Sequence, residues 1–210
     1  HRFAEKDLVL ISWMMDGWMD LYATFPIREP GDLRARQMRV SADDSALLFM
    51  AALGADVIQI PLSDVIPGMQ TGLVEGGEQS TQIFALAGLD AVANHFALTH
   101  HSYSTAGVVA NKTWWDSLSD DDRMVYRNAV PNAQWYRGLV LERNALYLDR
   151  AIQSGLNVVY PTAVEQASWQ NIGQRIHSDL IEEIGGDAAG LYAEIMKAKE
   201  AYVLQSAGQR

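Results

Sequence analysis

The sequence predicts an α/β fold in which short parallel strands alternate with helices. Three apolar runs, Met38–Val40, Val57–Ile60 and Leu73–Glu75, are separated by segments that carry helix-start and helix-stop residues. This order, with short connections, favours parallel strands joined by right-handed crossovers. Ligands of such open sheets lie beyond the carboxyl ends of the strands, so we expect a binding site there.

The first of these strands carries one lone arginine. Met38, Arg39 and Val40 alternate between apolar and charged side chains, so a strand buries Met38 and Val40 on one face and presents Arg39 on the other. From the residues alone, Arg39 is an exposed strand residue, an ion-pair partner between domains, or a ligand-binding group.

Helix signals follow the first two strands. Residues Asp43–Ser45 can cap a helix that runs through Leu53, and Gly54 supplies the left-handed residue that ends it. A second helix is expected to start at Ser63 and to end at Gly72.

Longer strands are expected on both sides of this central part. Leu8–Met15 is an apolar run suited to a buried strand, and Asp20–Phe25 is expected to continue as its partner. Phe96–Asn111 is rich in β-forming residues and lacks proline. It predicts one long strand, or two strands in line, that can link two domains.

The second half of the chain is mainly helical. Ser119 and the three aspartates that follow it are typical of a helix start, and apolar residues recur at helical spacing until Gly155. Pro131 lies inside this run and predicts a kink. Val158–Val159 is a brief strand.

Two further helices are predicted near the carboxyl terminus. Thr162 and Glu165 form a capping box for a helix that ends near Gly185, and Asp187 opens a last amphipathic helix.

The composition excludes several classes of function. The 16 basic and 26 acidic residues give a net charge of −10 without a basic run, which argues against a nucleic-acid partner. No cysteine occurs, so neither a disulfide framework nor a thiolate metal site is possible. No segment approaches the roughly 18 apolar residues of a membrane span, so we expect no direct membrane insertion.

Motifs for catalysis, metals and cofactors are also missing. The sequence has no nucleophile elbow, phosphate loop or dinucleotide fingerprint, so we expect no catalytic residues and no cofactor. His100 and His101 are adjacent on a predicted strand and point to opposite faces, so they cannot share one metal. We expect them to be hydrogen-bonded structural residues and favour a binding protein over an enzyme.

Ordered motifs along most of the chain are similar to one protein family. The chain resembles the solute-binding proteins of tripartite ATP-independent periplasmic (TRAP) transporters, of the four-carbon-dicarboxylate-binding (DctP-like) type. The segments that carry the resemblance are Asp32–Val40, Ala52–Ala55, Ser63–Val65, Met69–Gly72, Val74–Gly76 with Glu78, Thr99 with His101, Asn111–Lys112 and Trp115–Leu118.

The resemblance implies a two-lobed, periplasmic-binding-protein-like α/β fold with an incomplete first lobe. It implies a remnant of lobe one and hinge (1–30), the ligand-binding lobe two (31–100), a crossover strand and long hinge helix shared with lobe one (101–155), and the C-terminal part of lobe two (156–210). The protein is then expected in the periplasm, with its signal peptide and the first part of lobe one preceding this chain.

The resemblance also assigns roles to three polar residues. The family's matching arginine grips the ligand carboxylate, a task that suits Arg39 because a planar guanidinium meets both carboxylate oxygens at once. Gln79 replaces a usual asparagine and carries its amide one methylene farther out. Glu78 is expected to orient Arg39 or the loop rather than to bind an anionic solute directly.

Three apolar residues complete the predicted site. Met19 aligns with a second arginine of some acid-binding members, and Leu62 lies where the family is often aromatic. Trp13 is either a packing surface for the solute or an ordinary core residue. Met19 and Leu62, together with the longer amide of Gln79, predict a monocarboxylate with an apolar or hydroxylated body in preference to a succinate-like diacid.

The predicted function is therefore a receptor that captures a small organic acid and delivers it to the TRAP membrane subunits. Two alternatives remain open. One is a ligand-sensing domain of a signalling receptor, which a fused membrane helix would distinguish. The other is a small α/β hydrolase or lyase that uses His101 with Glu78, which would require turnover.

Overall fold

The computed structural model describes residues 2–207 and contains a six-stranded mixed sheet of order β3-β2-β4-β1-β5-β6. The parallel pairs are β2 with β3, β2 with β4, and β5 with β6, whereas β1 runs antiparallel to both β4 and β5. The strands are β1 Leu8–Ala23, β2 Gln37–Val40, β3 Asp56–Gln59, β4 Gly76–Ser80, β5 His95–Asn111 and β6 Asn157–Val159. This confirms the predicted α/β class and the parallel pairing of the central strands.

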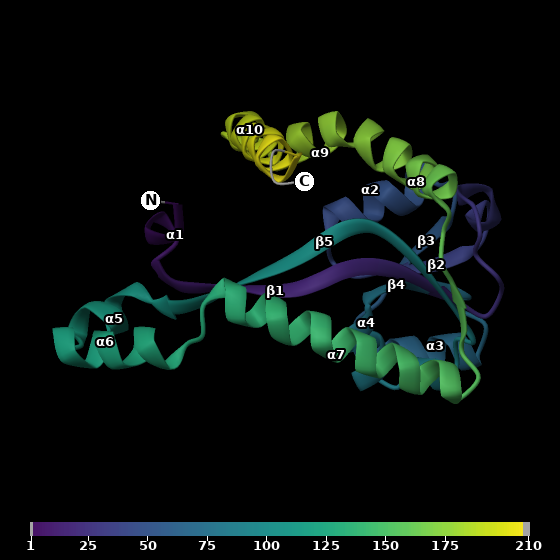
Figure 1. Ribbon diagram of the computed structural model, residues 1–210, viewed down its shortest axis with the longest axis horizontal. Coiled ribbons are helices and arrows are strands. Elements are labelled where there is room, and N and C mark those ends of the chain that lie inside the picture. The colour runs from purple at the N-terminus through teal and green to yellow at the C-terminus, as the bar shows by residue number, and fades with distance from the viewer. Residues whose placement is uncertain (1, 208–210) are drawn as a thin grey trace.

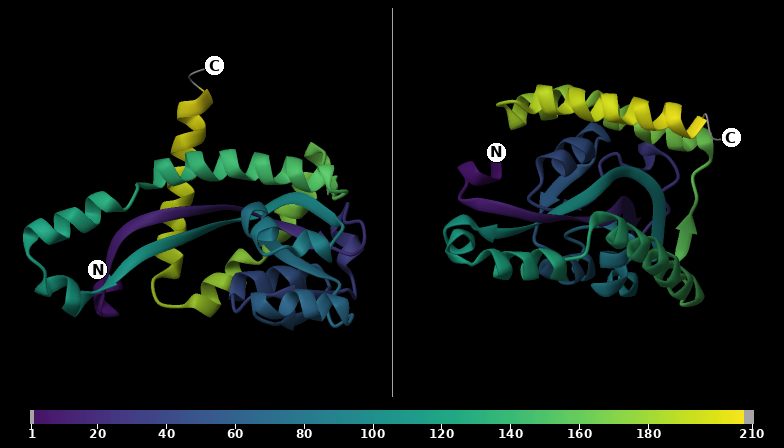
Figure 2. Two further views of the ribbon diagram at one scale, coloured as in Figure 1. Left: turned by 90° about the horizontal axis from the view of Figure 1, so that it is seen from below. Right: turned by 60° about the vertical axis from the view of Figure 1, so that its left-hand side comes forward.

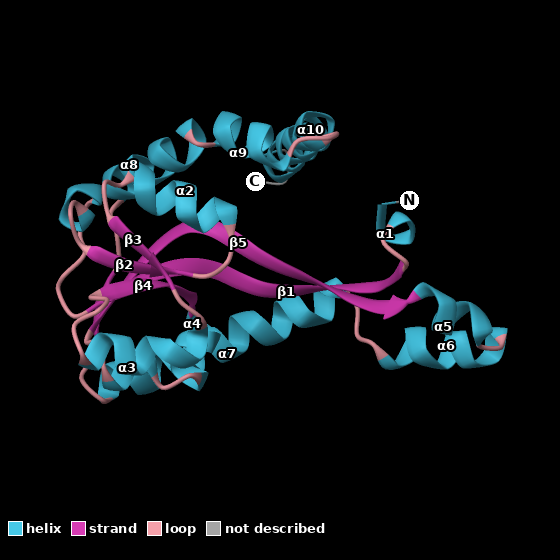
Figure 3. Ribbon diagram, turned by 180° about the vertical axis from the view of Figure 1, so that it is seen from behind, coloured by secondary structure: helices cyan, strands magenta, loops and turns pink. Residues whose placement is uncertain are grey.

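Helices cover both faces of the sheet. Figure 3 shows α2 and α8 on one face and α3, α4 and α7 on the other. The helices are α1 Arg2–Glu5, α2 Asp44–Ala52, α3 Val65–Gln70, α4 Thr81–Leu86, α5 Lys112–Ser117, α6 Asp120–Ala129, α7 Ala133–Gln153, α8 Ala163–Arg175, α9 His177–Ile184 and α10 Ala188–Ala207, with short 3-10 helices η1 Pro30–Leu33, η2 Leu62–Asp64 and η3 Leu89–Ala91.

Each face of the sheet has its own hydrophobic core. Met38 and Val40 of β2 are fully buried with Trp169 of α8 on the α2 side, as the alternating pattern predicted. Tyr22 of β1 and Phe84 of α4 are fully buried on the other side. The sheet is thus a rigid platform whose carboxyl-terminal edge can hold a site.

Strands β1 and β5 extend far beyond the other strands. They pair from Leu8 opposite Asn111 to Ala23 opposite His95, and Figure 1 shows them running together toward α5 and α6. The prediction that Asp20–Phe25 forms a separate partner strand is wrong. The register shifts near Gly17, whose φ of +115° favours glycine, so the chain bulges there and continues as one strand.

The position predicted for the strand β4 is also wrong. The strand forms at Gly76–Ser80 rather than at Leu73–Glu75. A Cβ atom on Gly77 would lie 2.6 Å from the hydroxyl oxygen of Tyr22 and 2.9 Å from the carbonyl oxygen of Arg39. Tight packing against Tyr22 therefore selects glycine, which hides the strand from any search for β-forming residues.

Two predicted helices are each broken in two. The run containing Pro131 forms α6 and α7, and Asn132 caps α7 by accepting a hydrogen bond from the backbone N–H of Trp135. The helix that begins at the Thr162 capping box divides into α8 and α9 near Ile176. Figure 2 shows that the last helix, α10, runs across the direction of α7. No helix within residues 2–207 combines the length and apolarity that a membrane crossing requires.

Candidate ligand-binding site

Arg39 lies in the middle of the sheet with part of its guanidinium uncommitted. The residue is 4% exposed, and its Nε–H donates a hydrogen bond to the carbonyl oxygen of Ile60 at 3.0 Å. Neither Nη1 nor Nη2 has a hydrogen-bond or ion-pair partner within residues 2–207. Two parallel N–H donors without partners can bind the two oxygens of a carboxylate.

Tyr22 lies in the same row of the sheet as Arg39. Gly77 pairs with Tyr22 on one side and with Arg39 on the other, so the tyrosine ring and the guanidinium share one face. Burial raises the pKa of the Tyr22 hydroxyl well above its ordinary value, the nearby Arg39 lowers it, and Glu78 raises it. The hydroxyl is buried and has no hydrogen-bond partner among the described residues.

A cavity of about 370 Å³ lies beyond the carboxyl ends of β2 and β4. We call it the acidic cavity because Asp16, Asp43 and Glu78 contribute carboxylates to its lining. Met19 and Gln79 line it as well. The remaining lining residues all carry hydroxyl groups and are Ser41, Ser45, Ser102, Tyr103, Ser104 and Thr105.

A chain of buried hydrogen bonds supports the floor of this cavity. Glu78 Oε2 lies 2.8 Å from His101 Nε2, and His101 Nδ1 lies 2.8 Å from the hydroxyl oxygen of Thr99. The imidazole of His101 is 1% exposed and stacks on Phe49 with ring centroids 4.4 Å apart. Gln166 of α8 donates a hydrogen bond to the carbonyl oxygen of Thr99, which ties this chain to the helix layer.

The neighbouring histidine has a separate partner. His100 donates its backbone N–H to Asp20 Oδ1 at 2.9 Å, and its ring Nδ1 lies 2.8 Å from the same oxygen. Its φ of +47° places the backbone in the left-handed region, and its ring stacks on Trp18. Both histidines are thus hydrogen-bonded, as predicted, and no cluster of metal-binding side chains occurs among residues 2–207.

The structure brings together some of the predicted site residues. Met19, Glu78 and Gln79 line the acidic cavity, and the side-chain oxygen of Gln79 accepts a hydrogen bond from the backbone N–H of Ser80. Arg39 is not among the residues that line this cavity, although Ser41, two residues later in the chain, does line it. Glu78 bonds to His101 rather than to Arg39.

Leu62 and Trp13 do not line the acidic cavity. Leu62 begins η2 two residues after Ile60, whose carbonyl oxygen accepts a hydrogen bond from Arg39. Trp13 is 47% exposed and packs edge-on against Phe3, near the far end of β1. The roles in ligand binding of all six predicted residues remain predictions.

Sequence reasoning missed the residues that give the cavity its polarity. Asp16 follows an apolar strand run, and Asp43 was assigned only to helix capping, a role that it does perform by accepting a hydrogen bond from the backbone N–H of Ser45. The hydroxyl-rich run 102–105 within a strand of β-forming residues was the one available signal.

The fold and the cavity define an α/β binding domain. A sheet with helices on both faces, a free guanidinium and a polar cavity at one edge provides a surface for a small polar solute. Within the described residues the imidazole of His101 is enclosed by Phe49, Thr99 and Glu78, which fits a supporting role better than a reacting one.

Comparison with known families identifies the class. The chain belongs to the DctP family, bacterial extracellular solute-binding protein family 7, whose model matches residues 1–183. It is 27% identical over 188 residues to the C4-dicarboxylate-binding periplasmic protein DctP of Rhodobacter capsulatus, covering 89% of this chain and 56% of that protein. It is 24% identical to the 2,3-diketo-L-gulonate-binding periplasmic protein YiaO of Escherichia coli, covering 85% and 55%.

Solved structures show the same fold. A TRAP periplasmic solute-binding protein of Chromohalobacter salexigens with bound D-glucuronate matches with a TM-score of 0.85 and 25% identity, covering 93% of this chain and 64% of that one. A Shewanella oneidensis protein with bound succinate matches with a TM-score of 0.80 at 22% identity, covering 88% and 61%. The fold is thus that of the two-lobed periplasmic-binding proteins, and the chain spans about half the length of its curated relatives.

Proposed function

We propose that this protein is a periplasmic receptor that captures an organic acid and delivers it to a TRAP-type membrane permease. The observation that carries the proposal is the buried guanidinium of Arg39, whose two terminal nitrogens lack partners within residues 2–207, in a sheet that has a polar cavity at its carboxyl edge. Family membership and the sugar-acid and succinate ligands of the structural neighbours support it.

The binding step follows from the arrangement of charge and burial. Arg39 binds the ligand carboxylate, while Gln79 and the hydroxyl groups of the cavity bind the body of the solute. A second wall closing over the ligand would remove water and strengthen the charged contacts, because electrostatic interactions grow as the local dielectric falls. The closed form would be the form that the membrane subunits recognise.

Thermal-shift screening of organic acids on the full-length protein tests the proposal, with calorimetry on each hit. We expect at least one monocarboxylic acid to raise the melting temperature in a concentration-dependent way, since a ligand that binds only the folded state stabilises it. Uptake of the hit by membrane vesicles that contain the permease tests delivery. A protein that binds no organic acid would overturn the proposal.

Selectivity depends on Met19, which brings an apolar group to the cavity. We expect a monocarboxylate to bind more tightly than succinate, because none of the described residues that line the cavity is a cation that could meet a second carboxylate. Met19→Arg should shift the preference toward the diacid, and Met19→Leu, which keeps the apolar character, should not. Tighter binding of succinate by the unaltered protein in a competition assay would contradict this prediction.

A further inference from the structure

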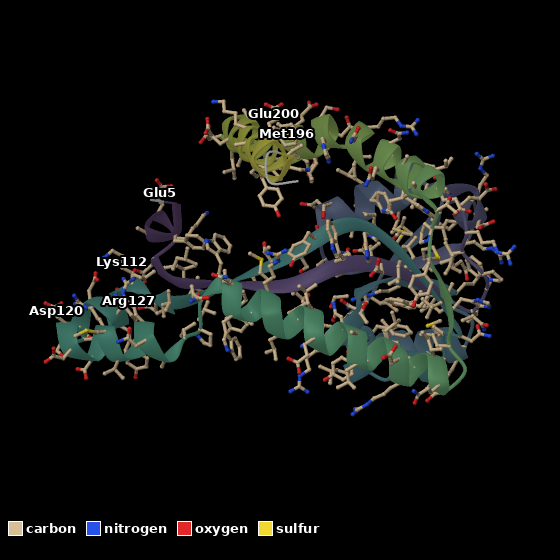
Figure 4. All side chains as sticks on the ribbon, in the orientation of Figure 1. Glu5, Lys112, Asp120, Arg127, Met196 and Glu200 are labelled. Atoms are coloured by element: carbon tan, nitrogen blue, oxygen red, sulfur yellow. The ribbon has the colours of Figure 1, made fainter. Side chains whose placement is uncertain are left out.

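Helix α10 lies on the outside of the molecule and leaves apolar side chains uncovered. Its main neighbour is α9, where the hydroxyl oxygen of Tyr192 lies 2.9 Å from Nδ1 of His177. Figure 4 shows Met196 of α10 at the outer edge of the molecule, and Figure 2 shows the helix extending past α7. Leu191 is 55% exposed and Ile195 is 50% exposed. Neighbouring exposed apolar side chains of this kind mark a contact surface.

An apolar groove between α9 and α10 continues this surface. It has a volume of about 170 Å³, and its walls include Leu180 and Ile184 of α9 and Leu191 and Ile195 of α10. Ile184 is exposed as well. Helices pack by placing the side-chain ridges of one helix into the grooves of another, so a further helix along this groove would cover its apolar walls. The groove therefore fits a helical partner.

The spacing of apolar residues along α10 is that of a helix that pairs with another helix. Leu191, Ile195, Ala198 and Tyr202 follow one another at intervals of four, three and four residues, which is a heptad repeat. Ile195 and Tyr202 take the a positions of this repeat, and Leu191 and Ala198 take the d positions. A β-branched residue at a with leucine at d favours two parallel helices, so we call these four residues the α10 seam.

The charged residues beside the α10 seam are placed for pairing with a second copy. Glu194 takes a g position, and Lys199 takes the e position of the next heptad. These positions face one another in a parallel pair, so Glu194 of each copy meets Lys199 of the other. Glu194 also bonds to Lys197 of its own helix at 2.7 Å, but both side chains are exposed and such a pair contributes little.

The net charge of α10 favours a second copy over other occupants. The helix carries two glutamates and two lysines and is neutral, whereas the chain has a net charge of −10. A neutral helix without a basic cluster is not drawn to an anionic lipid surface. It is, however, a surface at which two acidic chains can meet with little repulsion.

We infer that α10 is a contact surface between two copies of this chain, which pair with their α10 helices side by side and parallel. Leu191 and Ile195 lie at the centre of the contact, and the second α10 covers the exposed wall of the groove. Both copies contribute the same surface, so the assembly closes at two chains. The inference goes beyond solute capture and does not depend on which solute binds.

Sedimentation velocity of the full-length protein tests the pairing. We expect a concentration-dependent dimer that Ile195→Asp weakens by at least about tenfold, because the pair would bury a carboxylate from each copy in the α10 seam. Val164→Asp is the matched control, since Val164 lies at the start of α8 and is 81% exposed. This control should dissociate within about twofold of the unaltered protein.

Exchanging the two charges tests the partner and its orientation. Glu194→Lys places two cations together at each contact, and Lys199→Glu places two anions together, so each change should weaken the dimer roughly fivefold at low salt. The two changes made together should restore the affinity. Loss of the local bond from Glu194 to Lys197 would not be repaired by a change at Lys199, so recovery identifies pairing between copies.

A single introduced cysteine tests the parallel register. Residues 1–210 contain no cysteine, and parallel helices bring each d residue next to its own counterpart. Ala198→Cys should therefore link two full-length chains under mild oxidation. Ala193→Cys, at an exposed position on the side of α10 away from the seam, should not.

The outcomes are independent of the proposed function, which solute affinity decides. A full-length protein that stays monomeric at every concentration overturns the inference, because its own first lobe or another partner then covers α10. A dimer that Ile195→Asp leaves intact, or that the double exchange of charge does not restore, also overturns it. Equal linking through Ala193→Cys and Ala198→Cys does so as well.

Discussion

Replacing Arg39 with lysine tests the carboxylate-binding end of the site most directly. Both side chains are charged, but lysine lacks the planar pair of donors that can hold both oxygens of a carboxylate. Nη1 and Nη2 of Arg39 have no partner within residues 2–207, so both are free for the ligand. Losing one charge-assisted hydrogen bond costs about 1.5–3 kcal/mol, which predicts a Kd weaker by about 10- to 150-fold.

Calorimetry of Arg39→Lys beside Arg36→Lys isolates this effect. Arg36 precedes the same strand, bonds to Glu75 at 2.8 Å and lies over the ring of Phe25, away from the acidic cavity. The Arg36 variant should therefore bind as the unaltered protein does. Since Arg39→Lys also loses the bond from Nε to the Ile60 carbonyl, melting curves must show that the variant is folded at the assay temperature. Affinity within about twofold of the unaltered protein would refute the role of Arg39.

Two further predictions concern the sheet beneath the site. Burial raises the pKa of Tyr22, so above pH 10 the folded protein keeps the phenolic proton while the unfolded protein loses it. The free energy of unfolding should therefore be unaffected below pH 10 and should fall as the pH rises further, by at most about 1.4 kcal/mol per pH unit. Denaturant titrations of Tyr22→Phe should lack this fall, and an identical pH profile would show that Tyr22 is not its source. A Cβ on Gly76 would collide with the carbonyl oxygen of Tyr22, so Gly76→Ala should destabilise the fold by about 1–3 kcal/mol. Gly138→Ala, in helix α7 with open space around it, should be neutral or stabilising, and equal losses in the two variants would contradict the steric argument.

The sequence correctly predicted the starts and ends of helices, because these depend on residues that are close together in the chain. The cap at Asp43, the stop at Gly54 with φ +77° and the Thr162 capping box lie where the sequence placed them. The predicted alternation of side chains around Arg39 is also confirmed. Successive side chains of a strand point to opposite faces of the sheet even where both faces are buried.

Elements that depend on distant contacts were not predictable in the same way. Pro131 indicated a kink, but the chain leaves the helix altogether because Asn132 is available to cap a new one. The continuity of β1 through Gly17 depends on pairing with β5, which lies about 90 residues later in the sequence. Neither the break between α6 and α7 nor the continuity of β1 can be predicted from a window of ten or twenty residues.

The position of β4 also determines which side chains Glu78 can reach. With the strand assigned to Leu73–Glu75, the segment that follows was treated as a loop, where no face can be assigned to a side chain. In the structure Gly77 pairs with Arg39 and Glu78 pairs with Leu21, so the glutamate lies on the opposite face from the arginine.

On the face of the sheet opposite Arg39, strand β5 supplies the hydrogen-bond partner of Glu78. Between Ala97 and Ser102 the pairing with β1 is interrupted, and His101 within this bulge reaches Glu78 at 2.8 Å. A register shift of one residue would instead have placed Glu78 beside the guanidinium, where it would compete with a ligand carboxylate for the same donors. The two close-packed glycines fix that register against Tyr22 and Ala23, and so they keep Arg39 free of Glu78, which lies on the opposite face of the strand.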